Sequence, residues 1–232
     1  AGVGSRISRH VDKPKCLLEI EGKSILRRTV EMLAQNGVQS IVVTGYQHAL
    51  IEENLKGVDV TLLNNPFFRV TNSLGSLWFA RDYIRDDEEL YLMNADVFWQ
   101  QDIFDILKEE ERDVLLLADS SIARLEGGDY FFGVADNKIV KYGKELAREI
   151  RTHEYGRIHP AFLPPFRKML HTLMEAEQYT SWWEDVLYQL STDYDVFVRD
   201  VAGHFWAEVD YIEDYERIMA YIYERNAKAA AK

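Results

Sequence analysis

The sequence predicts an α/β protein with a Rossmann-like, doubly wound, mostly parallel mixed sheet. The first observation behind this is the alternation of short apolar, β-branched runs with helical periodicity through the first half of the chain, at the spacing of β-α-β units. Parallel strands joined in this way have right-handed crossovers, which place helices on both faces of the sheet. The second is a hydrophobic content of 47% over 232 residues, which is enough for one large domain.

In the first half, strands are predicted from apolar runs and helices from their end signals. Ser24 is a suitable helix N-cap, and Gly37 stands where a helix C-terminal glycine belongs. The expected elements are a helix between Ser24 and Gly37, a strand over 40–44, a helix over 48–56, strands over 58–63 and 90–93 with a helix over 76–84 between them, a helix over 103–110 and a strand over 114–118. Ligands of such sheets bind beyond the carboxyl ends of the strands, and Asp96 lies just after one of them.

The second half has a different pattern. Asp136-Asn137 between two apolar runs predicts a β-hairpin over 130–142. Further along, we expect helices over 163–178 and 182–190, strands over 195–201 and 205–209, and a closing helix over 211–224 with Asp210 as its N-cap. We expect a single domain over 1–225 that lacks the strand leading into its opening glycine turn, with a smaller subregion over about 125–200 and a frayed tail over 226–232.

Composition excludes several classes of function. The 27 basic and 39 acidic residues give a net charge of −12, without the basic patch of a nucleic-acid-binding protein. No run approaches the roughly 18 apolar residues of a membrane span, and no signal peptide is visible. The single cysteine, Cys16, cannot form an internal disulfide, and we interpret it as a small buried residue. We therefore expect a cytoplasmic protein whose anionic substrates meet a local cluster of cations.

The opening of the chain has the composition of a phosphate-binding turn. Glycines let backbone N–H groups approach phosphate oxygens, and nearby cations add positive charge. By itself a G-x-G-S-R run is also compatible with an ordinary turn. Together with a Pro-Lys pair about ten residues later, it is a more specific signal of a triphosphate-binding site. The P-loop pattern and the third glycine of a dinucleotide fingerprint are both missing. The residues proposed to contact phosphate are Ala1, Gly2, Gly4, Ser5, Arg6 and Lys15.

Two acidic motifs stand at predicted strand ends. Asp96 follows the strand over 90–93, and Glu208 and Asp210 are two residues apart, so they lie on one face of a strand. Carboxylates at such positions are natural ligands of a hard cation such as Mg²⁺. The alternative is that Asp96 is a turn or capping residue and that Asp210 caps the last helix.

In this order, the glycine turn, the Pro-Lys pair and the two acidic motifs resemble the sugar-1-phosphate nucleotidyltransferase family. The similarity is stronger to its LicC-like phosphocholine cytidylyltransferase branch, and it covers nearly the whole chain. Three segments carry it: Thr71–Leu77 (T-N-S-L-G-S-L), Trp182–Asp185 (W-W-E-D) and Phe205–Asp210 (F-W-A-E-V-D). The resemblance implies the nucleotide-diphospho-sugar transferase fold.

The resemblance also implies a Mg²⁺-dependent transfer of CMP from CTP to a small phosphorylated or phosphonylated alcohol or amine, with release of pyrophosphate. Arg6 and Lys15 then hold the triphosphate, and Asp96 and Asp210 hold the metal, with Glu208 as a further ligand. Positioning and charge neutralisation carry such a reaction. The remaining residues expected at the nucleotide are Thr71, Asn72, Ser76 and Asn94.

The acceptor is expected to be phosphocholine or 2-aminoethylphosphonate. A quaternary ammonium is recognised by aromatic faces with carboxylates nearby. The resemblance places Trp183 and Tyr130 in such a cage, with Trp182 and Glu184 beside it, although aromatic residues of this kind also serve the core. Lys141 is the first choice for the acceptor phosphate, against the alternative of a solvated charged face.

Two other functions remain open from the sequence. One is a sugar-1-phosphate nucleotidyltransferase that uses UTP, dTTP or GTP, which needs a longer sugar-binding insert than these residues provide. The other is a nucleotide-binding module without turnover, against which Lys15, Asp96 and Asp210 argue. The sequence leaves the oligomeric state open, a homodimer included.

Overall fold

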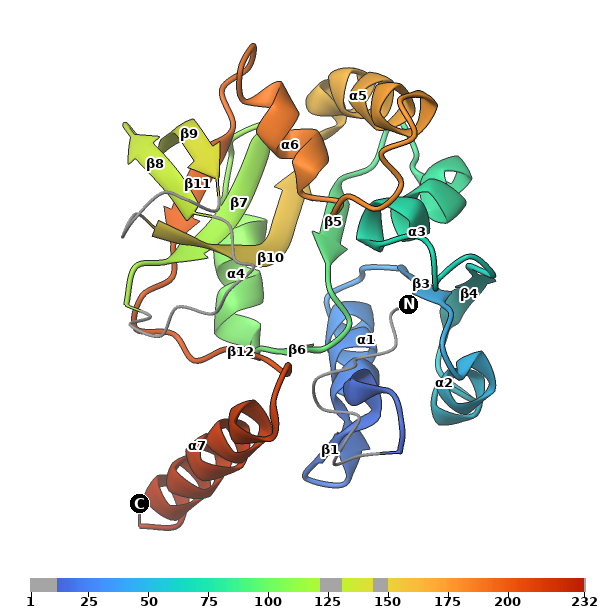
Figure 1. The fold of residues 1–232 in the computed structure, drawn as a ribbon. Coiled ribbons are helices and arrows are strands. Elements are labelled where there is room, and N and C mark those ends of the chain that lie inside the picture. Colours follow the sequence, from blue (N-terminus) through green and yellow to red (C-terminus); the bar gives the residue numbers. More distant parts are fainter. Residues whose placement is uncertain (1–11, 122–130, 144–149, 232) are drawn as a thin grey trace. The chain divides into compact units, whose positions relative to one another are not determined.

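The computed structural model describes residues 12–121, 131–143 and 150–231 (Figure 1). Two compact units divide the chain. Unit 1 consists of Ala1–Arg69, Ala95–Gln101 and Phe205–Lys232, and unit 2 of Val70–Asn94 and Asp102–His204. None of the helices in the described ranges has the length and apolar character that crossing a membrane requires.

Among its described residues, unit 1 contains three pairs of strands and three α-helices. Its elements are η1 (Lys15–Leu17), β1 (Glu19–Ile20), β2 (Lys23–Ser24), α1 (Ile25–Gln35), β3 (Ser40–Thr44), α2 (His48–Asn54), β4 (Val60–Asn64), β6 (Val97–Phe98), β12 (Ala207–Glu208) and α7 (Ile212–Ala230). β3 and β4 are parallel, whereas the pairs β1–β2 and β6–β12 are antiparallel. Ser24 caps α1 as predicted, since its Oγ accepts a hydrogen bond from the Arg27 N–H at 3.0 Å.

Two apolar clusters hold unit 1 together. One joins η1, α1 and α2 to the β3–β4 pair, and it includes Cys16, whose predicted burial is confirmed at 8% exposure. Burial raises the pKa of the Cys16 thiol to about 12, so the thiol stays protonated near neutral pH. The other packs α7 against β6 and β12 through Phe98, Ala207 and Val209. This second cluster fixes the strand pair that carries the acidic residues.

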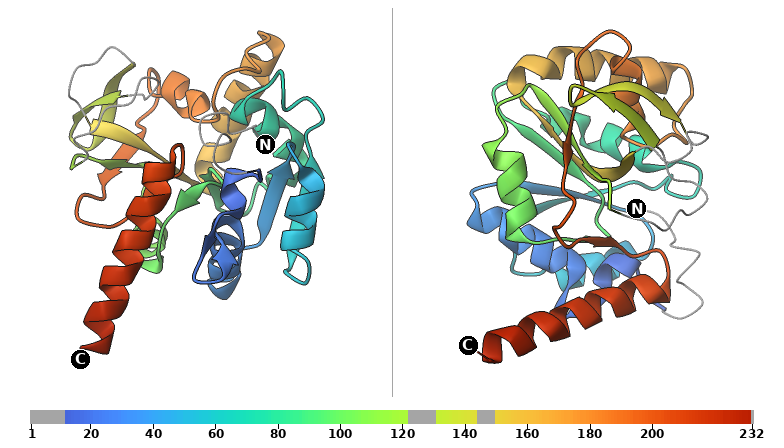
Figure 2. Two further views of the ribbon diagram at one scale, coloured as in Figure 1. Left: turned by 60° about the horizontal axis from the view of Figure 1, so that its bottom comes forward. Right: turned by 90° about the vertical axis from the view of Figure 1, so that its left-hand side faces the viewer.

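The last helix differs from the prediction at both ends. Its N-cap is Tyr211, not Asp210, because the Asp214 carboxylate accepts hydrogen bonds from the backbone N–H groups of both Asp210 and Tyr211, at 3.0 and 2.8 Å. At the other end α7 continues to Ala230 instead of ending at Glu224, and Figure 2 shows it as one uninterrupted helix. The alanine-rich sequence predicted as a tail has high helix propensity and extends the helix.

Unit 2 is built on one six-stranded sheet. Its elements are α3 (Ser73–Ala80), η2 (Arg81–Tyr83), β5 (Leu90–Met93), α4 (Gln101–Glu109, shared with the end of unit 1), β7 (Val114–Asp119), β8 (Phe131–Ala135), β9 (Lys138–Gly143), β10 (Ile150–Ile158), η3 (Pro160–Phe162), α5 (Leu163–Glu175), α6 (Asp185–Leu190) and β11 (Phe197–Asp200). The strand order is β5-β10-β7-β11-β9-β8. The predicted hairpin is present as β8 and β9, with Asp136 and Asn137 both at positive φ.

Strand β10 was not predicted, and it changes the character of the sheet. It lies between β5 and β7 and is antiparallel to both, so β7–β11 is the parallel pair among the described strands of this sheet. Its sequence resembles a charged surface because it contains Arg157, which is nonetheless buried and ion-paired with Glu89. The predicted α/β class with a mixed sheet is confirmed, with a larger antiparallel share than expected.

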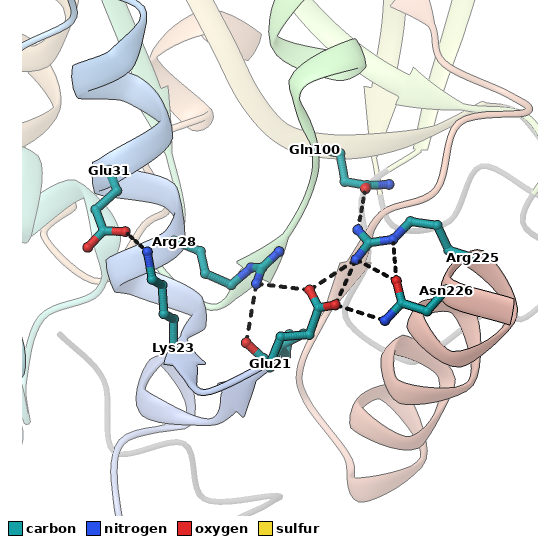
Figure 3. A network of polar contacts seen from close by, with 8 residues as sticks. Glu21, Lys23, Arg28, Glu31, Gln100, Arg225 and Asn226 are labelled. Carbon is teal, nitrogen blue, oxygen red and sulfur yellow. Dashed lines mark hydrogen bonds and ion pairs between the residues drawn. The ribbon is translucent and has the colours of Figure 1, made fainter. Parts of the chain in front are cut away.

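A polar network ties the C-terminal part of α7 to the β1–β2 turn within unit 1 (Figure 3). The Glu21 carboxylate accepts hydrogen bonds from Asn226 at 3.0 Å and from Arg225 at 2.9 and 3.0 Å. Arg28 approaches the same carboxylate at 3.3 Å. The hydrogen bond from Asn226, together with that of Arg225 and the charges of Arg225 and Arg28, outweighs burial and lowers the pKa of Glu21.

We predict that Glu21→Gln destabilises the protein by about 0.5–1 kcal/mol near neutral pH, as expected for a partly exposed charge network. Since the pKa of Glu21 is lower in the folded protein than its ordinary value of 4.5, this contribution is present above that pH. It is lost as the pH falls through the folded-state pKa. Urea unfolding of both proteins between pH 3 and 7 (about two units either side of the ordinary value) measures the difference.

The matched control is Glu53→Gln on α2, whose ion pair with Lys56 at 3.8 Å involves two largely exposed side chains. It should leave stability within about 0.5 kcal/mol of wild type at every pH. A Glu21→Gln deficit that persists unchanged at pH 3 would contradict the assignment to the ionised carboxylate.

Candidate active site

Lys15, at the start of η1, is surrounded by three carboxylates of unit 1. Its Nζ lies 2.5 Å from Asp96 Oδ2, 2.8 Å from Asp210 Oδ1 and 4.0 Å from Glu208 Oε1. The four side chains are between 15% and 23% exposed, so the cluster is shielded but open to solvent. The structure thus brings together the cation and the acidic motifs that the sequence singled out.

Strand pairing explains why these distant residues meet. β12 pairs with β6 so that Glu208 lies opposite Val97 and Ala207 opposite Phe98, and the Val209 N–H donates to the Asp96 carbonyl at 3.1 Å. Alternation along the chain places Ala207 and Val209 in the apolar cluster beneath α7. Glu208 and Asp210 therefore point to the opposite side, where Asp96 and Lys15 lie.

The electrostatics of this cluster keep Lys15 charged. Burial disfavours the ammonium and by itself lowers its pKa, but the attraction of Asp96, Glu208 and Asp210 is larger in sum, so the pKa of Lys15 is raised above its ordinary value. Among the described residues, three carboxylates lie within 4.0 Å of this one ammonium. Carboxylates gathered in this way are also suited to a divalent cation.

The donor set fits magnesium held by protein and substrate together. Mg²⁺ is usually bound by one or two carboxylates plus substrate phosphates and water, and Asp96 and Asp210 already converge on a single cation here. Within the described ranges no group of three or more His, Cys, Asp or Glu side chains is arranged to hold a metal by itself. The arrangement therefore suits an ion that enters with further oxygen ligands.

Unit 2 joins two of the other predicted motifs by backbone hydrogen bonds. The Asn72 N–H donates to the Tyr179 carbonyl at 3.0 Å, and the Leu74 N–H donates to the Ser181 carbonyl at 3.2 Å. Asn72 is also the N-cap of α3, accepting from the Ser73 N–H at 2.9 Å. The T-N-S-L segment thus lies along the chain that leads into the W-W-E-D segment.

Trp183 connects three elements of unit 2. Its backbone N–H donates to Ser73 Oγ at 2.9 Å, and its indole N–H donates to Asn94 Oδ1 at 3.2 Å. The ring is 3% exposed and packs over Gly156 of β10, where a Cβ atom would lie 3.1 Å from the indole. Ser73 was not among the predicted site residues. The capping pattern of Asn72 was the signal that could have identified the start of α3 and with it Ser73.

Three aromatic or acidic side chains in this part of unit 2, Trp182, Asp185 and Tyr142, are half-buried. Asp185 Oδ2 accepts from the Trp182 backbone N–H at 2.9 Å, which begins the turn into α6. Burial and the charge of Asp185 raise the pKa of Tyr142, whose ring stacks on Tyr188 with centroids 5.3 Å apart. Tyr142 was missed by the sequence analysis, which chose its neighbour Lys141.

The other predicted site residues fall into two groups. Ala1, Gly2, Gly4, Ser5, Arg6 and Tyr130 lie outside the described residues. Those described are Glu184, which is buried in front of α6, Ser76, which lies in the first turns of α3, and Lys141, which is exposed on β9. Their roles toward a ligand stay predictions.

Comparison with known proteins identifies the family of this chain. The family model described as a MobA-like NTP transferase domain matches residues 1–181. A choline-phosphate cytidylyltransferase of Haemophilus influenzae is 39% identical over 106 residues, which is 45% of this chain and 44% of that protein. A CTP:phosphoglutamine cytidylyltransferase of Campylobacter jejuni is 22% identical over 93% of this chain and 95% of that one.

The fold also matches a solved structure. The CTP:phosphocholine cytidylyltransferase LicC of Streptococcus pneumoniae superposes with a TM-score of 0.78 over 96% of both chains, at 16% sequence identity. This match confirms the predicted fold, and the family model together with the choline-phosphate cytidylyltransferase relative confirms the predicted resemblance. At this identity the match establishes the fold alone.

We predict that Gly75→Ala in α3 destabilises unit 2 by about 1–3 kcal/mol, the cost of overpacking a tight site. A Cβ atom at position 75 would lie 2.6 Å from Thr71 Cβ, closer than real Cβ contacts allow. Denaturant unfolding measures the loss. The double variant Thr71→Gly/Gly75→Ala removes the clash and should recover part of it, whereas strictly additive losses would contradict a direct contact.

Proposed function

The chain belongs to the family of MobA-like NTP transferase domains, and we propose that it transfers CMP from CTP to a small phosphorylated or phosphonylated acceptor that carries an amine or ammonium group. CTP is favoured because it is the nucleotide named for both the Campylobacter jejuni cytidylyltransferase and LicC. Phosphocholine and 2-aminoethylphosphonate are the favoured acceptors. The proposed cofactor is Mg²⁺.

The observation that carries this proposal is the convergence of Asp96 and Asp210 on one cation. Nucleotidyl transfer needs little covalent chemistry from the protein, since it displaces pyrophosphate from the α-phosphorus in line. What it needs is a place where negative charge on phosphate oxygens is neutralised and held. The Lys15 cluster combines a fixed positive charge with carboxylates suited to a divalent ion.

The residues have distinct roles in this mechanism. Asp96 and Asp210 would hold Mg²⁺, which when bound neutralises charge on the triphosphate and orients it. Lys15 donates to phosphate oxygens, and Glu208, which lies on the same face as Asp210, orients the lysine. The acceptor oxygen attacks as an anion already formed on a phosphate or phosphonate group, so no side chain has to remove a proton from it.

Recognition of the acceptor is proposed for the half-buried group of Tyr142, Trp182 and Asp185 in unit 2. An amine or quaternary ammonium is favoured by an aromatic ring and a carboxylate that both keep contact with solvent. Burial and the charge of Asp185 both raise the pKa of Tyr142, and Asp185 also accepts from the Trp182 backbone N–H. Trp183, in contrast, has its indole N–H bonded to Asn94 and its ring in the core.

We predict that Asp96→Asn and Asp210→Asn lower the rate of CTP-dependent pyrophosphate release by about a hundred- to a thousandfold while both proteins remain folded. The loss follows from removing one ligand of the metal. Coupled-enzyme detection of pyrophosphate measures the rate, and circular dichroism checks the fold.

Glu213→Gln is the matched control, because Glu213 is an exposed acid in the first turn of the helix that follows Asp210. It should keep the wild-type rate within about threefold, as a surface charge away from the cluster. Wild-type turnover in purified Asp96→Asn or Asp210→Asn would remove the basis of the proposed function.

A panel of small phosphates tests the acceptor class. We expect phosphocholine or 2-aminoethylphosphonate to be used at least about tenfold better, by kcat/KM, than a neutral polyol phosphate, the scale of a partly desolvated cation–π contact and its charge. Asp185→Asn keeps an oxygen that can accept from the Trp182 backbone N–H but loses the charge, so it should raise KM for the amine acceptor and leave KM for CTP unchanged. Equal use of the neutral acceptor would contradict cation recognition.

A further inference from the structure

We propose that Lys15 is an internal counter-ion that occupies the position of the metal between Asp96 and Asp210, so that free Mg²⁺ is bound weakly and enters the site only together with a triphosphate that draws the lysine away. This inference rests on the proposed function for the identity of the ligands. It adds an order of events: the metal and the nucleotide bind cooperatively through one lysine.

The geometry makes the lysine and a metal mutually exclusive. The ammonium lies between the two carboxylates, 2.5 Å from Asp96 Oδ2 and 2.8 Å from Asp210 Oδ1, at the place that a metal held by both acids through these oxygens would take. A Mg²⁺ ion needs its oxygen ligands at about 2.0–2.1 Å in octahedral geometry. It cannot satisfy that geometry while the ammonium stands between the same two oxygens.

Charge explains why free metal does not simply displace the lysine. Removing Lys15 from the acids without giving it a new partner would leave an ammonium desolvated and unpaired, which is costly. Hydrated Mg²⁺ also loses water reluctantly. A triphosphate removes both obstacles, since its oxygens accept the lysine and also supply further ligands to the metal.

The chain around Lys15 allows this exchange without refolding. Its backbone is fixed by η1, in which the Leu17 N–H donates to the Pro14 carbonyl at 2.8 Å and the Leu18 N–H to the Lys15 carbonyl at 3.1 Å. The side chain has four flexible carbons and remains 20% exposed, so the ammonium can swing while the main chain stays in place.

Binding of Mn²⁺, a spectroscopic substitute for Mg²⁺, tests the proposal in the absence of any nucleotide. Electron paramagnetic resonance counts free Mn²⁺ during titration of the wild-type protein, Lys15→Met and Lys15→Met/Asp96→Asn. We expect Lys15→Met to bind one Mn²⁺ about 5- to 150-fold more tightly than wild type. This is the usual change in affinity when one binding equilibrium is coupled to another. Adding Asp96→Asn should abolish the gain.

Lys13→Met is the matched control, because Lys13 carries the same charge two residues away and pairs with Glu19 at 3.6 Å instead of with the cluster. It should bind Mn²⁺ as wild type does. If both lysine variants gain affinity equally, the effect is one of net charge and the proposal is overturned. It is likewise overturned if Lys15→Met gains nothing.

A measurement on the wild-type protein covers the case in which Lys15→Met does not fold. The side-chain ¹⁵N resonance of Lys15, in a sample labelled at lysine Nζ, should stay in place when Mg²⁺ alone is added and shift when Mg²⁺ and CTP are added together. A shift with Mg²⁺ alone would overturn the proposal.

The two hypotheses fail separately. Tighter Mn²⁺ binding by Lys15→Met, with no pyrophosphate release by wild type on any acceptor, would keep the lysine's role and reject the transfer reaction. CMP transfer by the wild-type protein, with no tighter Mn²⁺ binding by Lys15→Met, would keep the transfer reaction and reject the lysine's role.

Discussion

The pairing of β12 with β6 is the constraint on which the candidate site depends. Each strand is only two residues long, yet their register sets the side on which every residue from Ala207 to Asp210 lies. Because side chains alternate along a strand, a slip by one residue would turn Glu208 and Asp210 into the apolar cluster and expose Val209. Packing of Ala207 and Val209 beneath α7 prevents that slip. The long last helix thereby serves the site without contributing a side chain to it.

The Lys15 cluster is an arrangement that stability alone does not favour. Taking an ammonium and several carboxylates partly out of water costs free energy, and pairing often no more than compensates for it. The protein nevertheless brings acids from two distant segments to one lysine, although a similar fold could be closed with apolar residues. Local departures of this kind from the arrangement that best stabilises a fold are typical of functional sites.

Local patterns in the sequence were sufficient for most of the fold and for the members of this cluster. Apolar runs gave β3, β5 and β7 nearly at their observed bounds, and the Asp136-Asn137 pair gave the hairpin. β10 was missed because its buried Arg157 looks like a surface residue. The ion pair with Glu89 and the hydrogen bond to the Arg112 carbonyl, both formed in the folded chain, explain its burial. The N-cap of α7 was misplaced for a similar reason. Aspartate is a favoured N-cap residue, but the Asp210 side chain is ion-paired with Lys15. The Asp214 carboxylate instead accepts the hydrogen bond from the Asp210 backbone N–H.

The W-W-E-D segment shows what sequence cannot separate. Two adjacent tryptophans look equivalent in a motif, but the chain turns into α6 between them and gives them different environments. Trp183 is held in the core by Ser73, Asn94 and the space above Gly156, whereas Trp182 stays half-buried and shares its turn with Asp185. The buried Trp183 ring, with its N–H bonded to Asn94, fixes the position of the adjacent Trp182. The proposed selectivity for a cationic acceptor therefore rests on the half-buried residues Trp182, Asp185 and Tyr142, and the buried tryptophan sets how rigidly its neighbour is held.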